Sequence, residues 1–149
     1  MKRRIPPGRR FSILDRVCKA RINERAKDYG LTAVQFRVLG CLSRLESYGT
    51  EEVNQKDLEQ EEHLTQQTMT EIIKKLEAKG FVVCTVSEKD RRYKKIACTP
   101  EYKEIHRKIA AEDEQVFLDL CDGLSREEID LLFSITDKIL RNIGYDPDT

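Results

Sequence analysis

The chain has 149 residues, with 27 basic and 27 acidic side chains, a length typical of one domain or one intertwined protomer. Its five cysteines are odd in number and none are closely spaced, which argues against a disulfide framework or a zinc motif, and no stretch is long and apolar enough to cross a membrane. The basic first ten residues lack the apolar core of a signal peptide, so we expect a soluble cytoplasmic protein.

The balanced total charge conceals a segregated distribution. Residues 1–30 carry a net charge of +7 and residues 64–98 carry +4, whereas residues 31–63 carry −4 and residues 99–149 carry −7. Such positive segments can hold a polyanion in a chain of zero net charge, although solvated helices also segregate charge in this way.

Helical periodicity dominates the first half of the chain. Gly30 ends a first helix that Phe11 opens, Thr32 caps a second helix that ends near residues 47–49, and Asn54 with Asp57 starts a short third helix. Thr65 then caps a fourth helix. Its apolar face consists of residues at helical spacing: Met69, Ile72, Ile73 and Leu76.

After Gly80 the period changes to that of strands. Residues 81–86 and 93–98 are rich in β-branched and apolar side chains, which predicts a hairpin with a polar, basic tip at 87–92. Thr99 and Pro100 begin a long helix to about Cys121, and Ser125–Glu128 is a capping box for a last helix. The sequence therefore predicts a mainly α fold in which residues 31–98 form a winged helix-turn-helix domain, with the hairpin as the wing.

The fourth helix carries the residue types that read DNA. Gln bonds adenine edges, Thr bonds bases or phosphates and Lys neutralises phosphate, while Glu71 either accepts from a cytosine amine or pairs with Lys75. The candidate DNA-binding residues of this helix are Thr65, Gln66, Gln67, Thr70, Lys74 and Lys75. Taken alone, the pattern fits an ordinary amphipathic surface helix equally well, but the hairpin that follows favours a DNA-binding unit.

The hairpin tip adds Lys89, Asp90, Arg91 and Arg92 to the candidates. A narrow minor groove attracts an arginine, and a neighbouring aspartate can orient that arginine by a charge-assisted hydrogen bond. The alternative is a solvated tip whose charges only discourage edge pairing.

Ordered motifs from about residue 11 to residue 143 resemble the MarR (multiple antibiotic resistance regulator) family. The matching segments are Gly30–Leu39, Gln55–Leu58, Leu64–Thr68, Leu76–Phe81, Asp90–Arg92, Thr99–Pro100, Gly123–Ser125 and Asn142–Ile143. The resemblance implies a dimer with interlocked first, fifth and sixth helices, a recognition helix at about 65–79, and a wing Arg92 oriented by Asp90. It also implies a regulator, often a repressor released by aromatic ligands, oxidants or metals. Two positions depart from the pattern: Glu62, where the family usually has an apolar residue, and Tyr102, where it often has glycine and where we expect little consequence in a helix.

The terminal helices predict self-association. Their apolar stripes exceed what a winged domain with its own core needs, so we expect residues 1–30 and 99–149 to form a dimerisation region. A two-fold dimer places two recognition helices about one DNA turn apart, which predicts a pseudo-palindromic double-stranded operator.

The sequence leaves several candidates for the signal to which such a regulator responds. Cys18 lies in the first helix, as in oxidant-sensing relatives, and is either a redox sensor or a small packed hydrophobe, whereas Cys84 and Cys98 on facing strands are expected to be packed. Only His63 and His106 are present, in different helices, so we expect no metal site and no cofactor. A small-molecule effector is possible, but the sequence does not identify its pocket.

Motifs of catalysis are missing from the sequence. It has no GxSxG, P-loop or dinucleotide-binding glycine motif and no paired catalytic constellation, so we expect no catalytic residues and no enzyme. The leading hypothesis is a dimeric, sequence-specific DNA-binding regulator. The alternative is a winged-helix module that binds a protein partner without specific DNA binding, because winged domains serve both purposes.

Overall fold

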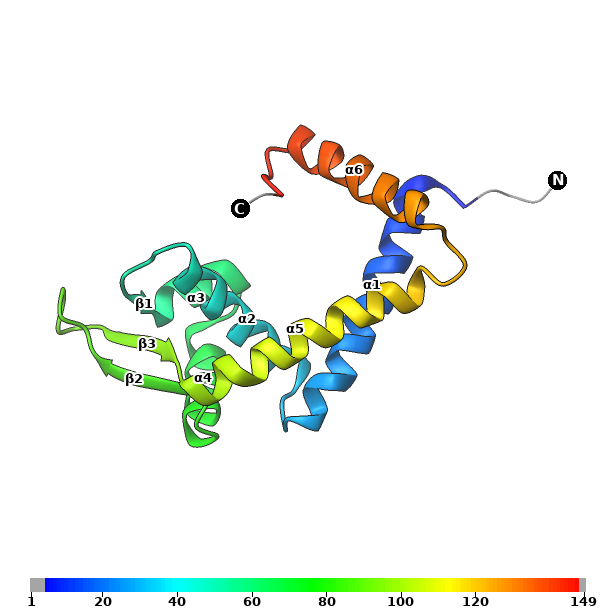
Figure 1. Ribbon diagram of the computed structural model, residues 1–149. Helices are drawn as coiled ribbons and strands as arrows, with labels where there is room; N and C mark the ends of the chain where they lie inside the picture. The colour runs from blue at the N-terminus through cyan, green and yellow to red at the C-terminus, as the bar shows by residue number, and fades with distance from the viewer. Residues whose placement is uncertain (1–4, 148–149) are drawn as a thin grey trace. The chain divides into compact units, whose positions relative to one another are not determined.

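The computed structural model describes residues 5–147, and the chain divides into two compact units, Met1–Asp113 and Glu114–Thr149 (Figure 1). The first unit contains α1 (Pro7–Asp28), α2 (Ala33–Ser47), β1 (Val53–Asn54), α3 (Gln55–Glu62), α4 (Gln66–Ala78), β2 (Val82–Val86), β3 (Lys94–Cys98) and the start of α5 (Pro100–Leu120). The second contains the end of α5 and all of α6 (Arg126–Asn142). This order confirms the predicted mainly α fold with a winged helix-turn-helix. Within the described residues, no helix is long and apolar enough to span a bilayer.

Local capping explains where the helices begin. Capping boxes open α2, α3 and α6 at Thr32, Asn54 and Ser125, as the sequence predicts for the last two, and the Thr32 box is completed by Gln35. Each box satisfies two backbone amides that a helix N-terminus otherwise leaves unpaired. Helix α1 begins at Pro7, earlier than the predicted start at Phe11, because proline in the first turn gives up no intrahelical hydrogen bond.

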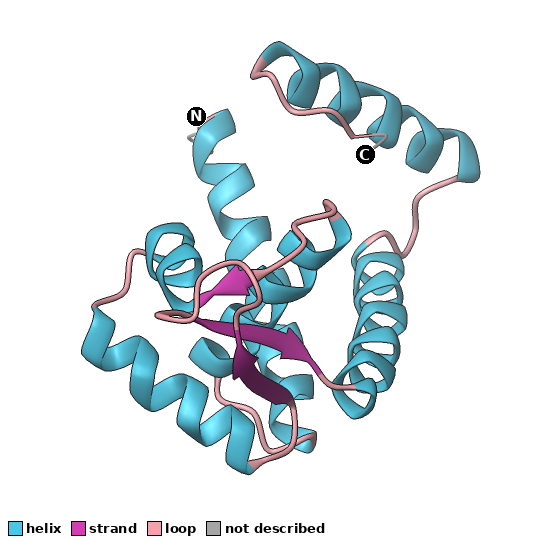
Figure 2. Ribbon diagram, turned by 90° about the vertical axis from the view of Figure 1, so that its left-hand side faces the viewer, coloured by secondary structure: helices cyan, strands magenta, loops and turns pink. Residues whose placement is uncertain are grey.

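The wing belongs to a three-stranded sheet of order β1-β3-β2, in which the predicted hairpin is joined by a strand that the sequence did not reveal (Figure 2). In the hairpin, Val82 pairs with Cys98 and Val86 with Lys94. The extra strand β1 pairs Val53 with Ile96, and both side chains are buried. This pairing ties the segment in front of α3 to the base of the wing.

The core of the first unit lies under α4 and the sheet. All four apolar residues predicted for the inner face of α4 are buried: Met69, Ile72, Ile73 and Leu76. Tyr102 is also completely buried, with its ring 6.1 Å from that of Phe81 and 5.8 Å from that of His106. The expectation that Tyr102 matters little is therefore wrong, because this side of α5 faces the core.

Helix α6 of the second unit has no buried residue. Phe133 packs its ring 5.3 Å from that of Phe117 yet remains 51% exposed. Other large apolar side chains of α6 and its C-terminal end are also exposed: Leu131, Leu132, Ile135, Ile139 and Ile143. An apolar stripe on a helix normally faces a core, and within the single chain the stripe of α6 is left largely uncovered.

Candidate nucleic-acid interface

Helix α4 presents its polar residues to solvent because its apolar side is held by the core. Its N-cap is Thr65, whose Oγ1 accepts from the Thr68 amide at 3.3 Å, as predicted. The predicted residues that are exposed are Thr65, Gln66, Gln67, Lys74 and Lys75, and Thr70 is half-buried. Among the described residues, neither lysine forms an ion pair, so the alternative pairing of Glu71 with Lys75 is not found. Within this part of the chain both lysines are therefore exposed and without an acidic partner, so they are accessible to a polyanion.

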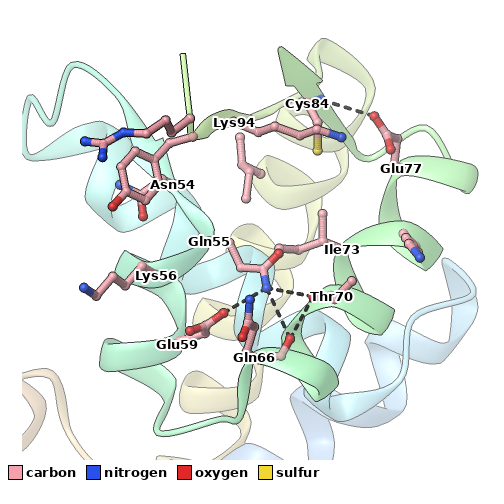
Figure 3. A pocket seen from close by; sticks show the side chains of 14 residues that line it. Asn54, Gln55, Lys56, Glu59, Gln66, Thr70, Ile73, Glu77, Cys84 and Lys94 are labelled. Carbon is pink, nitrogen blue, oxygen red and sulfur yellow. Dashed lines mark hydrogen bonds between the residues drawn. The ribbon is translucent and has the colours of Figure 1, made fainter. Parts of the chain in front are cut away.

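Thr70 is fixed by a contact between the two helices of the helix-turn-helix. Gln55 Nε2 donates to Thr70 Oγ1 at 2.8 Å and to the Gln66 carbonyl oxygen at 3.2 Å (Figure 3). Thr70 in turn donates its own hydroxyl proton to the Gln66 carbonyl at 2.8 Å. Its only donor is thus engaged, which leaves a lone pair and a methyl group to meet a ligand.

An open groove of about 550 Å³ separates α3 and α4 from the hairpin (Figure 3). It brings together residues that are far apart in the sequence, with Gln66, Thr70 and Lys74 from α4 opposite Arg92 at the hairpin tip. The other lining residues are Asn54, Gln55, Lys56, Glu59, Ile73, Glu77, Cys84, Tyr93, Lys94 and Ile96. The groove thus places side chains of α4 and of the wing on one continuous surface of mixed polar and apolar character.

The tip of the wing holds Arg92 by a bidentate contact with Asp90. Arg92 Nη2 donates to Asp90 Oδ2 at 2.7 Å, Nε donates to both carboxylate oxygens at 3.1 Å, and the Arg92 amide donates to Oδ1 at 3.0 Å. These bonds hold the pKa of the Asp90 carboxyl below its usual range and raise the pKa of Arg92. The Arg92 side chain remains 84% exposed, so it is oriented without being withdrawn from solvent.

The remaining wing cations differ in their surroundings. Lys89 pairs with Glu51, a partner that sequence reasoning missed, and this contact lowers the pKa of Glu51 and raises that of Lys89. Arg91 is exposed and forms no ion pair within residues 5–147. The tip of the wing, residues 87–92, therefore contains one neutralised, one oriented and one unpaired cation, a distinction that no local sequence signal carries.

The acidic end of α3, which departs from the family pattern at Glu62, is held by arginines of α2. Arg37 Nε lies 2.5 Å from Glu62 Oε2, and Arg44 Nη2 lies 3.1 Å from Glu61 Oε2. The apolar anchor of α3 remains Leu58, which is completely buried. The acidic pair thus faces α2, and α3 is still packed.

The cysteines are all free thiols, and they differ in accessibility. Cys18 and Cys84 are half-buried, whereas Cys41, Cys98 and Cys121 are buried. Burial raises the pKa of Cys41, Cys84 and Cys98, the last to about 12. In the part of the chain that the structure describes, no three His, Cys, Asp or Glu side chains come together as a metal site.

Comparisons with known proteins place this geometry in a family. The MarR family profile matches residues 29–92. The HTH-type transcriptional regulator SarZ of Staphylococcus aureus is 31% identical over 119 residues, which cover 80% of this chain and 76% of SarZ.

Solved structures agree in fold. The apo form of Escherichia coli MarR superposes with a TM-score of 0.78 at 20% identity, covering 93% of this chain and 99% of MarR. A variant of S. aureus MepR bound to an oligodeoxyribonucleotide has a TM-score of 0.69 at 19% identity, covering 94% of this chain and 99% of MepR. The relatives are transcriptional regulators and not enzymes, which confirms the expectation from the sequence. The chain belongs to the MarR family and is a DNA-binding transcriptional regulator with a winged helix-turn-helix.

Proposed function

We propose that the protein is a cytoplasmic homodimer that binds a pseudo-palindromic double-stranded operator, with α4 in the major groove and Arg92 in the minor groove. The single observation that carries the proposal is the open groove between α4 and the wing, which is lined by Lys74 of α4 and by the oriented Arg92 of the wing. The proposed DNA-contacting residues are Thr65, Gln66, Gln67, Thr70, Lys74, Lys75, Lys89, Asp90, Arg91 and Arg92. The related MepR variant was solved with an oligodeoxyribonucleotide, which supports DNA binding by this chain.

The exposed apolar side chains of the terminal helices support the dimer. In α1, Phe11 is 56% and Leu14 is 52% exposed, and α6 buries no residue in the single chain. Apolar surface of this kind on a helix is characteristic of an interface. We assign residues 1–30 and 99–149 to the dimerisation region, which sets two copies of α4 about one DNA turn apart.

The proposal includes repression that a small molecule or a redox signal relieves. Cys18 is the candidate sensor for the redox signal, supported by its partial exposure in α1, whereas Cys41, Cys98 and Cys121 are buried and burial raises the pKa of the other half-buried thiol, Cys84. A sensing thiol needs access to its oxidant. Oxidation with one equivalent of peroxide is expected to weaken operator binding by the native chain and to leave a Cys18→Ala variant unaffected.

The test is selection of bound sequences from a random double-stranded DNA library, followed by affinity measurements against salt. We expect a pseudo-palindrome with half-sites about 10 base pairs apart. The logarithm of the binding constant should fall linearly with the logarithm of the salt concentration, with a slope of about −0.9 per neutralised phosphate. Arg92→Ala is expected to weaken binding without altering the mass of the dimer measured by sedimentation. Weak, sequence-blind binding by the native dimer would contradict the proposal and favour a module that binds a protein partner.

A further inference from the structure

The tip of the wing is held by a carboxylate that lies outside the hairpin. Glu52, in the segment before β1, accepts the hydroxyl hydrogen bond of Ser87 with Oε2 and the backbone amide of Glu88 with Oε1 at 3.0 Å. Ser87 is buried, at 6% exposure, although it stands where the strand gives way to the charged tip. Strand β1 fixes Glu52 in place, since the next residue, Val53, pairs with Ile96 of β3.

Ser87 passes this constraint on to the arginine. Its Oγ accepts the amide of Lys89 at 3.2 Å and the amide of Asp90 at 3.1 Å. Asp90 in turn accepts the Arg92 amide and clamps the Arg92 guanidinium. A continuous set of hydrogen bonds therefore runs from Glu52 through Ser87 and Asp90 to Arg92.

The chemistry of each group determines which atom donates and which accepts in this set of hydrogen bonds. A serine hydroxyl has one donor and two lone pairs, so donating its proton to Glu52 turns both lone pairs toward the amides of the tip. An ionised carboxylate only accepts, and here each oxygen takes one bond. The Ser87 hydroxyl and the Glu88 amide accordingly lower the pKa of the Glu52 carboxyl, which keeps it ionised at neutral pH.

We propose that Glu52 is a positioning residue of the wing, which raises operator affinity by holding Arg92 in place through Ser87 and Asp90, without itself touching DNA. The proposal rests on the proposed function, because it requires Arg92 to bind the minor groove. This expectation is the opposite of that from charge alone. A carboxylate near DNA repels phosphate, so its removal should strengthen binding.

Glu51 is a matched control, because it is the same residue type at the adjacent position and, among the described residues, it pairs with the Lys89 side chain and accepts no hydrogen bond from the backbone of the tip. Glu52→Gln and Glu51→Gln each remove one negative charge with little change of shape. We expect Glu51→Gln to free Lys89, tighten binding and steepen the salt slope by up to about 0.9 per protomer. We expect Glu52→Gln to weaken binding about threefold to tenfold, the size of one ordinary lost hydrogen bond, because the amide oxygen of Gln can still accept.

The experiment measures operator affinity, over the same series of salt concentrations, of the native dimer and of five variants: Glu51→Gln, Glu52→Gln, Ser87→Ala, Arg92→Ala, and Glu52→Gln combined with Arg92→Ala. Ser87→Ala should reproduce the loss of Glu52→Gln, and the loss should vanish in the Arg92→Ala background, since Glu52 acts through that arginine. Glu52→Gln should also relax the preference for A·T pairs at the positions that face the wing, which a general loss of folded protein does not do.

The outcomes separate the inference from the proposed function. If Arg92→Ala weakens binding while Glu52→Gln tightens it as Glu51→Gln does, the positioning role is overturned and the proposed function stands. Equal losses from Glu52→Gln with and without Arg92 would likewise overturn it. If Arg92→Ala leaves affinity and sequence preference unchanged, the minor-groove contact itself is wrong and the role of Glu52 falls with it.

Discussion

The hydroxyl group of Tyr102 is buried at the start of α5 and, among the described residues, has no hydrogen-bond partner. Burial also raises the pKa of this phenol, as expected for a group whose charged form is excluded from water. An unsatisfied buried hydroxyl costs about 1–3 kcal/mol relative to its hydrated state in the unfolded chain. We therefore expect Tyr102→Phe to stabilise the protein, although removing a hydrogen-bonding group more often has the opposite effect.

The expected gain is about 1–3 kcal/mol in the free energy of unfolding, or roughly 2–4 °C in Tm per kcal/mol for a chain of this size. Urea titration at a fixed protomer concentration measures it, because association with a second copy shifts apparent stability with concentration. Tyr93→Phe is the matched control. Its ring is 44% exposed, and the change should stay within about 0.5 kcal/mol.

Tyr102→Ala should have the opposite effect on the free energy of unfolding. It removes a ring that packs against Phe81 and His106, and it should cost about 3–5 kcal/mol as other buried aromatic truncations do. If Tyr102→Phe instead destabilises the protein by 0.5 kcal/mol or more, the hydroxyl has a partner in the folded state, such as an ordered water, and the reasoning from its burial is refuted.

Three further predictions test the site and its support. A double-mutant cycle of Arg37→Ala and Glu62→Ala should give a coupling of about 0.2–1 kcal/mol in urea titrations, as for other partly exposed ion pairs, and no coupling would mean that the pair does not hold α3. Because the folded-state pKa of Cys98 is raised from 9.0 to about 12, its contribution to stability is complete below pH 9 and is lost as the pH rises from 9 toward 12. The slope of unfolding free energy against pH in that window should be smaller in Cys98→Ala, and an unchanged slope would contradict the burial of this thiol. In alkylation at pH 8 followed by mass spectrometry, Cys18 should react well before Cys98, and the reverse order would exclude Cys18 as the accessible thiol.

Features fixed by neighbours in the sequence could be predicted well. The caps at Thr32, Asn54, Thr65 and Ser125 follow from side chains within three residues of the amides that they satisfy. The inner face of α4 follows from helical spacing alone. The clamp of Arg92 by Asp90 spans two residues, so the sequence suffices to propose it.

Features that depend on distant parts of the chain were missed. Strand β1 has only two residues, too few for an alternating pattern, and exists because β3 offers it a free edge. The contact of Glu52 with Ser87 spans 35 positions, and no motif marks it. Tyr102 was expected to have little consequence, because its helix alone does not show that Phe81, just before β2, packs against its ring.

The wing also shows why net charge along a sequence is a poor guide to a DNA-binding surface. Residues 64–98 carry a net charge of +4, yet that count treats Lys89 and Arg92 alike and omits Glu51 and Glu52, which lie outside the segment. In the fold, Glu51 neutralises Lys89, whereas Glu52 helps to orient Arg92 through bonds to the backbone of the tip. Two adjacent carboxylates thus have opposite expected effects on one polyanion, because Glu51 meets a side-chain cation whereas Glu52 meets the Ser87 hydroxyl and a backbone amide of the tip.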